Sequence, residues 1–511
     1  MVSTMIDPKP TGRPLRWGLP LAVFAFFAST ASGYGVFRDE LYYIACARHL
    51  DWGYVDHPPL VAVIARLAGW VFGPSWIALR MLSAAAAAGT VLLLGDTARA
   101  LGGGRWARLM AQVLTATAPV YVSLFSIYSM NGFDVLIWAG LARITVSLLS
   151  GGSPRLWLAF GCLAGVGLEN KFDVALLGAG IVGGLVLARR WDLFRSRWIW
   201  LGGLCAAALF VPHVLWQALH DWPTREFVAN AQRDKITPLG PIGFVARQFL
   251  MAGPVGFSFA LSGLFWLLTA RDALRYRPLG WAALAVLGLL ALSVSKPYYF
   301  APALTLLFPP AGAALEAWTS GRFRRPSRAV AMVAAASILV VAPIVKPLLS
   351  EDRSVRYAAS LGVRPGTDEK HRLGRLSQFF SDMHGWKELA ASVAAVHNAL
   401  PPADRAKACV YGQNYGEAGA IDYFGPALGL PLAMSGHNSY WMWGPGSCTG
   451  EVVLIIGGDR SDHLEHFASV EPGGEFRCND CMPYENDLTL WVARGLTVSL
   501  ATAWKASKHY D

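Results

Sequence analysis

The sequence predicts a mainly helical protein that crosses a membrane many times and ends in a small α/β domain. Three observations lead to this fold class. The 511 residues are 54% hydrophobic and only 15% charged, whereas soluble proteins carry about 25% charged residues. Apolar runs recur along the first two thirds of the chain, and runs of about 20 residues match a hydrocarbon core of about 30 Å. Beyond residue 347 the composition becomes that of a soluble domain.

Eleven apolar runs are predicted to span the membrane. They lie at residues 17–35, 77–97, 106–127, 131–149, 155–169, 173–188, 198–219, 248–269, 279–295, 298–317 and 328–347. The last run but one is separated from its predecessor only if Lys296-Pro297 forms a turn. Residues 58–73 are amphipathic and are expected to lie along the membrane interface. Residues 1–347 thus form the predicted transmembrane domain.

The short loops between these runs predict the orientation. With the polar tail 1–16 in the cytoplasm, alternate loops hold clustered arginines and the opposite loops hold most of the acids. Positive charge concentrates in cytoplasmic loops of membrane proteins. The predicted cytoplasmic arginines are Arg99, Arg105, Arg108, Arg155, Arg189, Arg190, Arg195, Arg197, Arg271, Arg275, Arg277, Arg322, Arg324, Arg325 and Arg328. The net charge of +10 therefore indicates orientation rather than nucleic-acid binding. We expect a multi-pass protein of a bacterial-type inner membrane with residues 348–511 outside.

Residues 348–511 are predicted to form an extracytoplasmic α/β domain. Residues 350–377 are charged and are interpreted as a linker, and 386–400 have a helical pattern. Ala408–Tyr411 and Glu451–Gly458 are strand-like apolar runs. No glycine fingerprint follows the second run, which argues against nucleotide binding. This part holds four of the seven cysteines: Cys409, Cys448, Cys478 and Cys481. Disulfides of open connectivity are favoured over a zinc site, because only one Cys-x-x-Cys pair exists.

The loop that follows the first apolar run, residues 36–75, concentrates charge beside the membrane. Asp39-Glu40 and Asp56-His57 are its most conspicuous pairs. Charges this close to hydrocarbon are costly and indicate function. Adjacent carboxylates on a helix point in different directions, so one can face a cavity while the other faces the backbone. The alternatives are an acidic pair at a helix N-terminus and a surface turn stiffened by the two prolines after His57.

The pattern RDELYY…GYVDHPPL resembles the first extracytoplasmic loop of the protein O-mannosyltransferase and aminoarabinose-transferase group. Members of that group have the GT-C fold and use polyprenyl-phosphate sugars. The resemblance implies that Asp39, with Glu40 beside it, is catalytic, and that Asp56 and His57 take the acidic and basic positions before the prolines. His57 stands where lysine is usual in the aminoarabinose transferases. It is therefore assigned to the donor phosphate, and a divalent metal ion held by Asp56 and His57 is a further possibility; no other cofactor is expected.

Four further positions complete the predicted donor site. Lys171 lies in a short predicted external turn, and Lys296 precedes Tyr298 and Tyr299 in a basic-Tyr-Tyr segment that resembles one of the same family. These residues are assigned to the donor phosphate, with a lysine that merely reaches the interface as the alternative. Asp134, at the outer end of a span, is assigned to a second acidic site with Asp56. A helix cap is the alternative there.

The expected function is transfer of a hexosyl or pentosyl group from a polyprenyl-phosphate donor to an acceptor hydroxyl on the outer membrane face, with inversion. The acceptor is left open between lipid, glycan and protein. A lipid flippase or transporter would also explain many spans, but it predicts broken helices and internal repeats. A binding protein would instead depend on the C-terminal domain. Two segments there, residues 412–419 and 435–446, mix aromatic and amide side chains, which suits either sugar recognition or packing.

Overall fold

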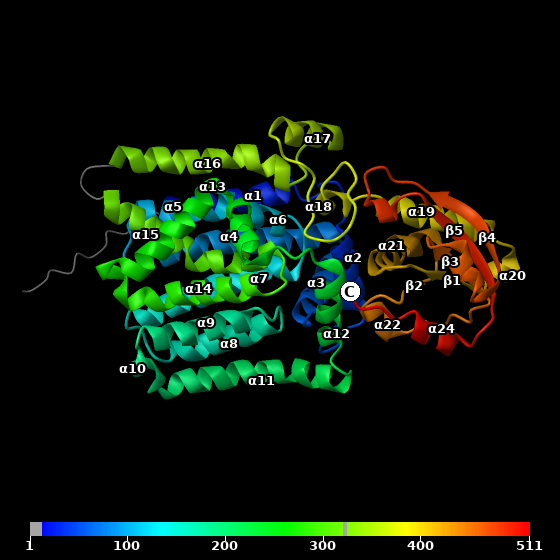
Figure 1. The fold of residues 1–511 in the computed structure, drawn as a ribbon, viewed down its shortest axis with the longest axis horizontal. Coiled ribbons are helices and arrows are strands. Elements are labelled where there is room, and N and C mark those ends of the chain that lie inside the picture. The colour runs from blue at the N-terminus through cyan, green and yellow to red at the C-terminus, as the bar shows by residue number, and fades with distance from the viewer. Residues whose placement is uncertain (1–12, 320–323) are drawn as a thin grey trace, which may run out of the picture. The chain divides into compact units, whose positions relative to one another are not determined.

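The computed structural model describes residues 13–319 and 324–511. Helices make up most of the described chain, and one sheet lies in its C-terminal part (Figure 1). The chain divides into two compact units. Unit 1 comprises Met1–Ala31, Arg80–Val211 and Pro238–Lys346, and unit 2 comprises Ser32–Leu79, Pro212–Thr237 and Pro347–Asp511. Most of the predicted cytoplasmic tail, Arg322, and the side chains of Arg324, Arg325 and Arg328 lie outside the described residues.

Unit 1 is built from helices that coincide with the predicted spans. They are α1 (Arg13–Ser29), α4 (Trp76–Ala100), α5 (Arg105–Thr117), α6 (Pro119–Leu124), α7 (Met130–Leu149), α8 (Leu156–Leu168), α9 (Val174–Leu187), α10 (Trp191–Phe194), α11 (Arg197–Leu219), α13 (Gly240–Thr269), η2 (Arg271–Tyr276), α14 (Arg277–Leu292), η3 (Pro297–Leu306), α15 (Phe308–Thr319) and α16 (Arg324–Val345). The ends of α4 and α11 extend into unit 2. Among the described helices, α4, α7, α11 and α13 are long and apolar enough to cross a membrane. Together η3 and α15, bent by 48°, would make a fifth. The predicted number of eleven spans is therefore not confirmed.

Glycines allow the helices of unit 1 to approach closely. A Cβ on Gly161 of α8 would lie 2.0 Å from the carbonyl oxygen of Gly202 on α11, and one on Gly184 of α9 would lie 2.2 Å from that of Pro278 on α14. Small residues at such contacts are typical of helices packed in a membrane. At Gly253 the positive φ of 75° before Pro254 kinks α13, which a larger side chain would resist.

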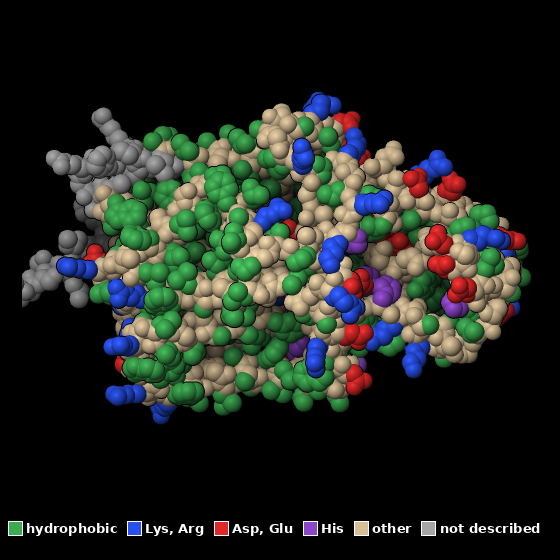
Figure 2. Space-filling model, viewed as in Figure 1, with side chains coloured by type: hydrophobic (Ala, Val, Ile, Leu, Met, Phe, Trp, Pro, Cys, Tyr) green, Lys and Arg blue, Asp and Glu red, His purple; other side chains and the backbone are tan. Residues whose placement is uncertain are grey.

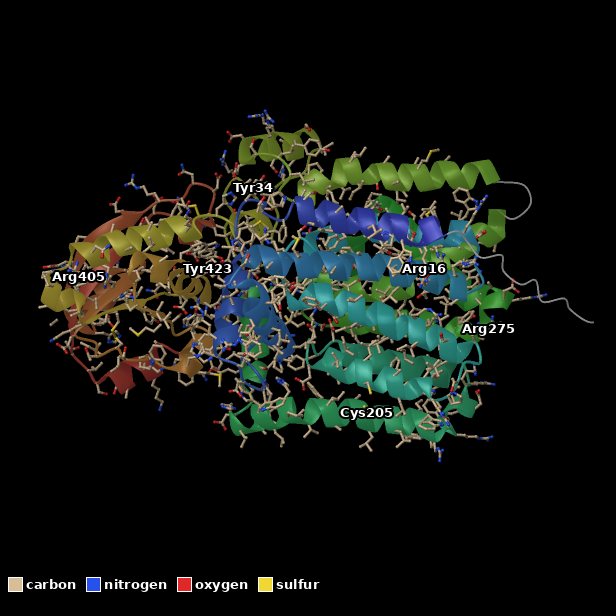
Figure 3. All side chains as sticks on the ribbon, turned by 180° about the vertical axis from the view of Figure 1, so that it is seen from behind. Arg16, Tyr34, Cys205, Arg275, Arg405 and Tyr423 are labelled. Atoms are coloured by element: carbon tan, nitrogen blue, oxygen red, sulfur yellow. A yellow bond between two sulfur atoms is a disulfide. The ribbon has the colours of Figure 1, made fainter. Side chains whose placement is uncertain are left out.

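Charge and apolar surface are sorted along unit 1. Hydrophobic side chains cover its length, and Lys and Arg side chains gather at one end (Figure 2). Arg16 and Arg275 both lie toward that end (Figure 3). There Asp96 accepts hydrogen bonds from Arg16 at 2.7 Å and from Arg108 at 2.9 Å. The sorting is what the clustered arginines of the sequence predict for one membrane face.

Unit 2 contains the sheet and the helices around it. Its elements are α2 (Arg38–Arg48), α3 (Leu60–Phe72), α12 (Pro223–Asn230), η1 (Ala231–Lys235), α17 (Glu351–Ser360), α18 (Gln378–Ser381), α19 (Trp386–Ala399), α20 (Pro402–Arg405), β1 (Ala408–Tyr411), α21 (Tyr415–Phe424), η4 (Gly425–Leu428), β2 (Ala433–Met434), α22 (Ser439–Trp443), β3 (Val452–Ile456), α23 (Arg460–Leu464), β4 (Phe467–Phe476), η5 (Pro483–Glu485), β5 (Leu488–Leu496) and α24 (Leu500–Ala506). The strand order is β2-β1-β3-β5-β4. Strand β1 runs parallel to β2 and β3, whereas β5 is antiparallel to β3 and β4.

The predicted helix at 386–400 and both predicted strands are confirmed as α19, β1 and β3. The interpretation of 350–377 as a linker was wrong in part, because α17 occupies Glu351–Ser360. Its N-terminal acids Glu351 and Asp352 favour a helix start. This helix is only 10 residues long and mostly polar, so it does not stand out as an apolar run in the sequence.

Unit 2 also draws in two segments from earlier in the chain. Helix α2 packs against α21 and against α3. Ile236 forms an isolated antiparallel bridge with Glu369, and the Asn230 side chain donates to the carbonyl oxygen of Tyr510 at 2.8 Å. The loop that carries the predicted catalytic acids is thus folded together with the sheet domain.

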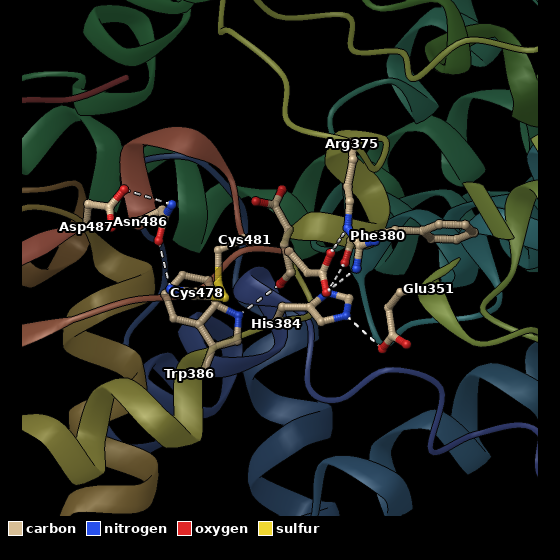
Figure 4. Close-up of a disulfide and its surroundings, with 11 residues drawn as sticks. Glu351, Arg375, Phe380, His384, Trp386, Cys478, Cys481, Asn486 and Asp487 are labelled. Carbon is tan, nitrogen blue, oxygen red and sulfur yellow. Dashed lines mark hydrogen bonds and ion pairs between the residues drawn. A yellow bond between two sulfur atoms is a disulfide. The ribbon is translucent and has the colours of Figure 1, made fainter. Parts of the chain in front are cut away.

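Two disulfides hold the sheet domain, Cys409–Cys448 and Cys478–Cys481. The second lies beside Trp386 at the start of α19 (Figure 4). A Cβ on Gly385 would lie 2.4 Å from the Cys481 sulfur, so only glycine fits against this bridge. The Cys-x-x-Cys pair is therefore a disulfide in this structure, as the count of cysteines favoured.

Candidate active site

The candidate site in unit 2 begins at the N-terminus of α2, where Asp39 and Glu40 point in different directions. The Glu40 carboxylate is fully buried and accepts the Phe37 backbone N–H at 2.7 Å. This bond satisfies one of the N–H groups that a helix start leaves without a partner. The Asp39 side chain is instead 35% exposed. Of the two predicted catalytic acids, Glu40 therefore stabilises the helix start and Asp39 presents the accessible carboxylate.

Asp39 is held by a tyrosine from α21. The Tyr415 hydroxyl donates a hydrogen bond to Asp39 Oδ1 at 2.9 Å. Tyr415 is buried. The Arg38 guanidinium lies over the Tyr415 ring, with its central carbon 5.2 Å from the ring centroid. A hydrogen bond to a charged acceptor fixes both its length and its direction. The fold thus orients this carboxylate while leaving part of it open.

Arg38 brings a buried positive charge next to Asp39. Its side chain is only 12% exposed, and its Nε lies 3.8 Å from Asp39 Oδ1. One Nη donates to the Tyr484 hydroxyl at 2.7 Å, and the other lies 3.9 Å from Asp382 Oδ2. Burial raises the pKa of Asp382 to about 6, although Arg38 acts against that rise. Since the guanidinium stays charged, this is the fixed cation of unit 2 nearest the predicted base.

Asp56 belongs to a second hydrogen-bonded network. Tyr42, which is buried, donates to Asp56 Oδ1 at 2.8 Å, and its hydroxyl also lies 2.7 Å from the Ser439 hydroxyl. The Val55 backbone N–H donates to the same Ser439 oxygen at 3.2 Å. Burial raises the pKa of Asp56, while His57 and the Tyr42 hydrogen bond lower it. Side chains of α2 and α22 therefore hold Val55 and Asp56, the residues shortly before the two prolines, in place.

His57 is buried among tyrosines. Its Nδ1 lies 2.8 Å from the Pro58 carbonyl oxygen, so Nδ1 carries the hydrogen and donates. Nε2 lies 3.7 Å from the Cys46 sulfur and 4.0 Å from Asp56 Oδ1. Two ligands of one metal ion at about 2.1 Å each would reach a separation of 4.0 Å only when nearly opposite each other. The pair as placed fits hydrogen bonding better than metal binding, and the predicted metal remains a prediction.

A different group of metal-ligand types lies nearby in unit 2. Ligand atoms of His437, His509 and Asp511 all lie within 4.8 Å of one another. His437 Nδ1 faces the Tyr415 backbone N–H at 3.4 Å, and Nε2 lies 3.0 Å from the main-chain oxygen of Asp511. The hydrogen of this imidazole is therefore on Nε2, and a metal ion would have to replace it. The same group ties the chain around residue 438 to the last residues, since the Asn438 backbone N–H donates to the His509 carbonyl oxygen at 3.0 Å.

Unit 1 contains a separate cluster that joins four predicted site residues. The Lys171 ammonium lies 2.9 Å from Asp173 Oδ2 and 3.7 Å from Asp134 Oδ2. It also lies 5.0 Å from the ring centroid of Tyr299 and 5.9 Å from that of Tyr298. The sequence predicts Lys171 and Asp134 as site residues separately. Because they lie far apart in the chain, it does not predict that they form an ion pair.

Charge balance limits what this cluster can do. Burial alone lowers the pKa of Lys171, but Asp173 and Asp134 together outweigh it, so the pKa lies above its ordinary value. The ammonium is charged, yet two carboxylates compensate it. A phosphate would bind here only if one carboxylate gave up its contact with the lysine. Lys296 lies directly before η3 and is half-buried.

Several residues of the candidate site were not predicted. Arg38 is one of several charges in the loop, and no motif in the sequence marks Tyr42, Tyr415 or Ser439 for a role. The two aromatic and amide-rich segments of the C-terminal domain contain Tyr415 and Ser439, so their unusual composition was the available signal. The composition of these segments does not reveal their hydrogen-bond partners, Asp39 and Tyr42, which lie almost four hundred residues earlier in the chain. His213 is buried, and its Nδ1 donates a hydrogen bond to the Trp52 carbonyl oxygen at 2.9 Å.

The sequence is similar to those of known glycosyltransferases. A family model described as dolichyl-phosphate-mannose-protein mannosyltransferase matches residues 56–216. The lipid A galacturonosyltransferase RgtD of Rhizobium johnstonii is 25% identical over 278 residues, which cover 51% of this chain and 56% of that protein. The chain thus spans little more than half the length of this curated relative.

Solved structures give the fold. ArnT from Cupriavidus metallidurans bound to undecaprenyl phosphate aligns with a TM-score of 0.63 at 14% identity, covering 94% of this chain and 98% of that one. The apo form of ArnT aligns with a TM-score of 0.62 at 16% identity, covering 93% and 97%. The predicted resemblance and the predicted GT-C fold are confirmed.

Proposed function

We propose that this chain, which has the GT-C glycosyltransferase fold and resembles the group that includes ArnT and the protein O-mannosyltransferases, transfers a sugar from a polyprenyl-phosphate donor to an acceptor hydroxyl. The observation that carries the proposal is the environment of Asp39. This carboxylate is partly exposed, is oriented by the Tyr415 hydroxyl at 2.9 Å, and lies beside the buried Arg38 guanidinium. Such an arrangement is suited to accept a proton and to face developing charge.

Asp39 acts in this proposal as the general base. The acceptor oxygen attacks the anomeric carbon of the donor while its proton passes to the Asp39 carboxylate. The bond between that carbon and the phosphate oxygen breaks, and the polyprenyl phosphate leaves as an anion. Attack from the side opposite the phosphate inverts the anomeric centre. No general acid is required, because a phosphate is already a fair leaving group.

Arg38 supports the reaction electrostatically. A fixed guanidinium in a partly dry site stabilises negative charge far better than one in water. It neutralises Asp39 before proton transfer, and it is a candidate partner for phosphate oxygens because guanidinium groups bind them in pairs. Asp56, His57 and Tyr42 keep the loop before the prolines in place.

For unit 1 we propose that Lys171, Tyr298 and Tyr299 serve the lipid phosphate, together with Lys296. This assignment is supported by the resemblance of the basic-Tyr-Tyr segment and by the approach of Lys171 to both rings. Asp134 compensates the lysine charge when no donor is present. ArnT has been solved with undecaprenyl phosphate, and that likeness supports a lipid-phosphate donor here. We further propose an inner-membrane location with unit 2 on the outer face.

The test is transfer from a panel of labelled polyprenyl-phosphate sugars in membranes that contain the wild type, Asp39→Asn or Asp459→Asn. Asp459 is an exposed carboxylate of the sheet domain and serves as the matched control. We expect Asp39→Asn to lose transfer and Asp459→Asn to keep it. Transfer that survives Asp39→Asn in a folded protein would remove this carboxylate from the mechanism. Donor movement across the membrane without transfer would favour a flippase.

A further inference from the structure

A groove in unit 2, distinct from the surroundings of Asp39, lies between α2, α3 and the start of α4. Its volume is about 210 Å³. Its walls include Ile44 and Gly69, and two arginines, Arg48 and Arg66, line it together with Ser75. All of its lining residues are described, and none of them is acidic. The groove therefore combines apolar walls with two positive charges.

Both arginines are held in place by the protein. Arg48 donates from Nη1 to the main-chain oxygen of Asp422 at 2.9 Å. The Arg66 guanidinium carbon lies 5.5 Å from the ring centroid of Trp70. The Nε of Arg66 is buried and has no hydrogen-bond partner in the structure. A buried N–H without a partner is costly, and an anion that enters the groove would satisfy it.

The rim of the groove is strongly apolar. Trp70 at the end of α3 is 69% exposed, and its neighbours Val71 and Phe72 are exposed to a similar degree. Large apolar side chains on an amphipathic helix with basic residues beside them are typical of a helix that lies in the membrane interface. The side chains at the rim suit acyl chains, whereas the arginines suit a negatively charged headgroup.

We propose that this groove binds the phosphate of an anionic membrane lipid, with the lipid chains over Trp70 and Phe72. Guanidinium groups match phosphate oxygens in charge and in geometry. The volume is below the roughly 300–1,000 Å³ of sites for drug-sized ligands, so the groove accommodates a small headgroup rather than a polyprenyl-linked sugar. Binding here anchors α3 and the loop before it, and it does not depend on the proposed transfer reaction.

The experiment measures thermal unfolding of the full chain in a nonionic detergent, with added phosphatidylglycerol or with phosphatidylcholine of the same acyl chains. We expect phosphatidylglycerol alone to raise the Tm of the wild type. Arg48→Gln with Arg66→Gln should weaken the apparent Kd for phosphatidylglycerol roughly tenfold or more, as expected when charge-assisted hydrogen bonds to a phosphate are lost. Arg405→Gln is the control for loss of charge. Arg405 lies in the same unit, well away from Tyr423, whose hydroxyl contacts the Pro74 carbonyl at the groove (Figure 3).

A second variant tests the groove without removing charge. A Cβ at Gly69 would meet no atom within 4 Å, so Gly69→Leu should fill the groove without disturbing the fold. It should abolish the phosphatidylglycerol effect. Gly203→Leu, on α11, is equally free of contacts and should retain it.

Three results would overturn the proposal. Phosphatidylglycerol could stabilise Gly69→Leu and the double arginine variant as much as the wild type. Phosphatidylcholine could stabilise the wild type equally. Soluble glycerol phosphate could give the same shift at the same concentration, which would show that lipid chains take no part.

Discussion

The most informative perturbation of the candidate site is Tyr415→Phe, because it removes one oxygen and leaves the ring. The lost group is the hydroxyl that donates to Asp39 Oδ1 at 2.9 Å. The ring beneath Arg38, 5.2 Å from its guanidinium carbon, is retained. The variant therefore tests the hydrogen bond that orients Asp39 without removing the ring that contacts Arg38.

The size of the effect follows from the type of bond. A hydrogen bond to a charged group contributes about 1.5–3 kcal/mol. At about 1.36 kcal/mol for each factor of ten in rate, full loss of that contribution in the transition state lowers kcat roughly 10- to 150-fold. Removing the base itself costs about 10²–10⁴-fold, so Tyr415→Phe should be less damaging than Asp39→Asn. The KM for the donor should change little.

The assay is steady-state transfer from the best donor found, measured as kcat and KM over a range of pH. Tyr440→Phe is the matched control, since it removes a tyrosine bond of 2.8 Å to a different carboxylate, Asp422. The reasoning fails if Tyr415→Phe stays within about twofold of the wild type, or if Tyr440→Phe is equally damaging.

Three further outcomes are expected. Burial raises the pKa of Glu485 to about 7 from 4.5, so its contribution to stability is present below 4.5 and is lost as the pH rises through 7. The Tm of the wild type should therefore fall more between about pH 5 and about pH 8 than that of Glu485→Gln, and parallel curves would contradict this. Lys171→Met should lower the unfolding free energy by about 3–5 kcal/mol, because it leaves buried carboxylates without a compensating charge. Adding Asp134→Asn to this variant should restore part of the lost Tm. A Tm that is not restored would count against the ion pair. Replacing Cys409 and Cys448, 39 residues apart, by Ser should cost about 4 kcal/mol from loop entropy, and an unchanged denaturation midpoint would show that the bridge is not formed.

The helical part of the fold could be predicted because apolar periodicity is a local signal. Each predicted span coincides with a helix or a helix pair, and α19, β1 and β3 lie where patterning placed them. Helix ends were less accurate, as at α13, which begins at Gly240 rather than 248. The number of membrane crossings was not confirmed, since length and composition identify only the longest helices.

The site could be predicted only in part, because its partners are distant in sequence. The charges of the loop pointed to Asp39, and the helix geometry of adjacent acids pointed to different directions for Asp39 and Glu40. Tyr415 could not be assigned to Asp39, since no pattern in one sequence links positions 376 residues apart. The Lys171 ion pair could not be predicted for the same reason: Asp134 lies on α7 and Lys171 lies in the turn between α8 and α9, and only tertiary contacts bring these segments together.

The composition of unit 2 from three separate segments has a consequence for how the protein is made. The loop with Asp39 leaves the ribosome long before Tyr415, its partner 376 residues later. At about 5–20 residues per second, the acidic loop waits roughly 20–75 s without the surface that orders it. During that time its buried charges, Glu40 and Arg38 among them, stay hydrated rather than packed. Completion of this unit is thus a late event of biosynthesis, and a chain that ends before the sheet domain would carry the acidic loop without Tyr415, which orients Asp39.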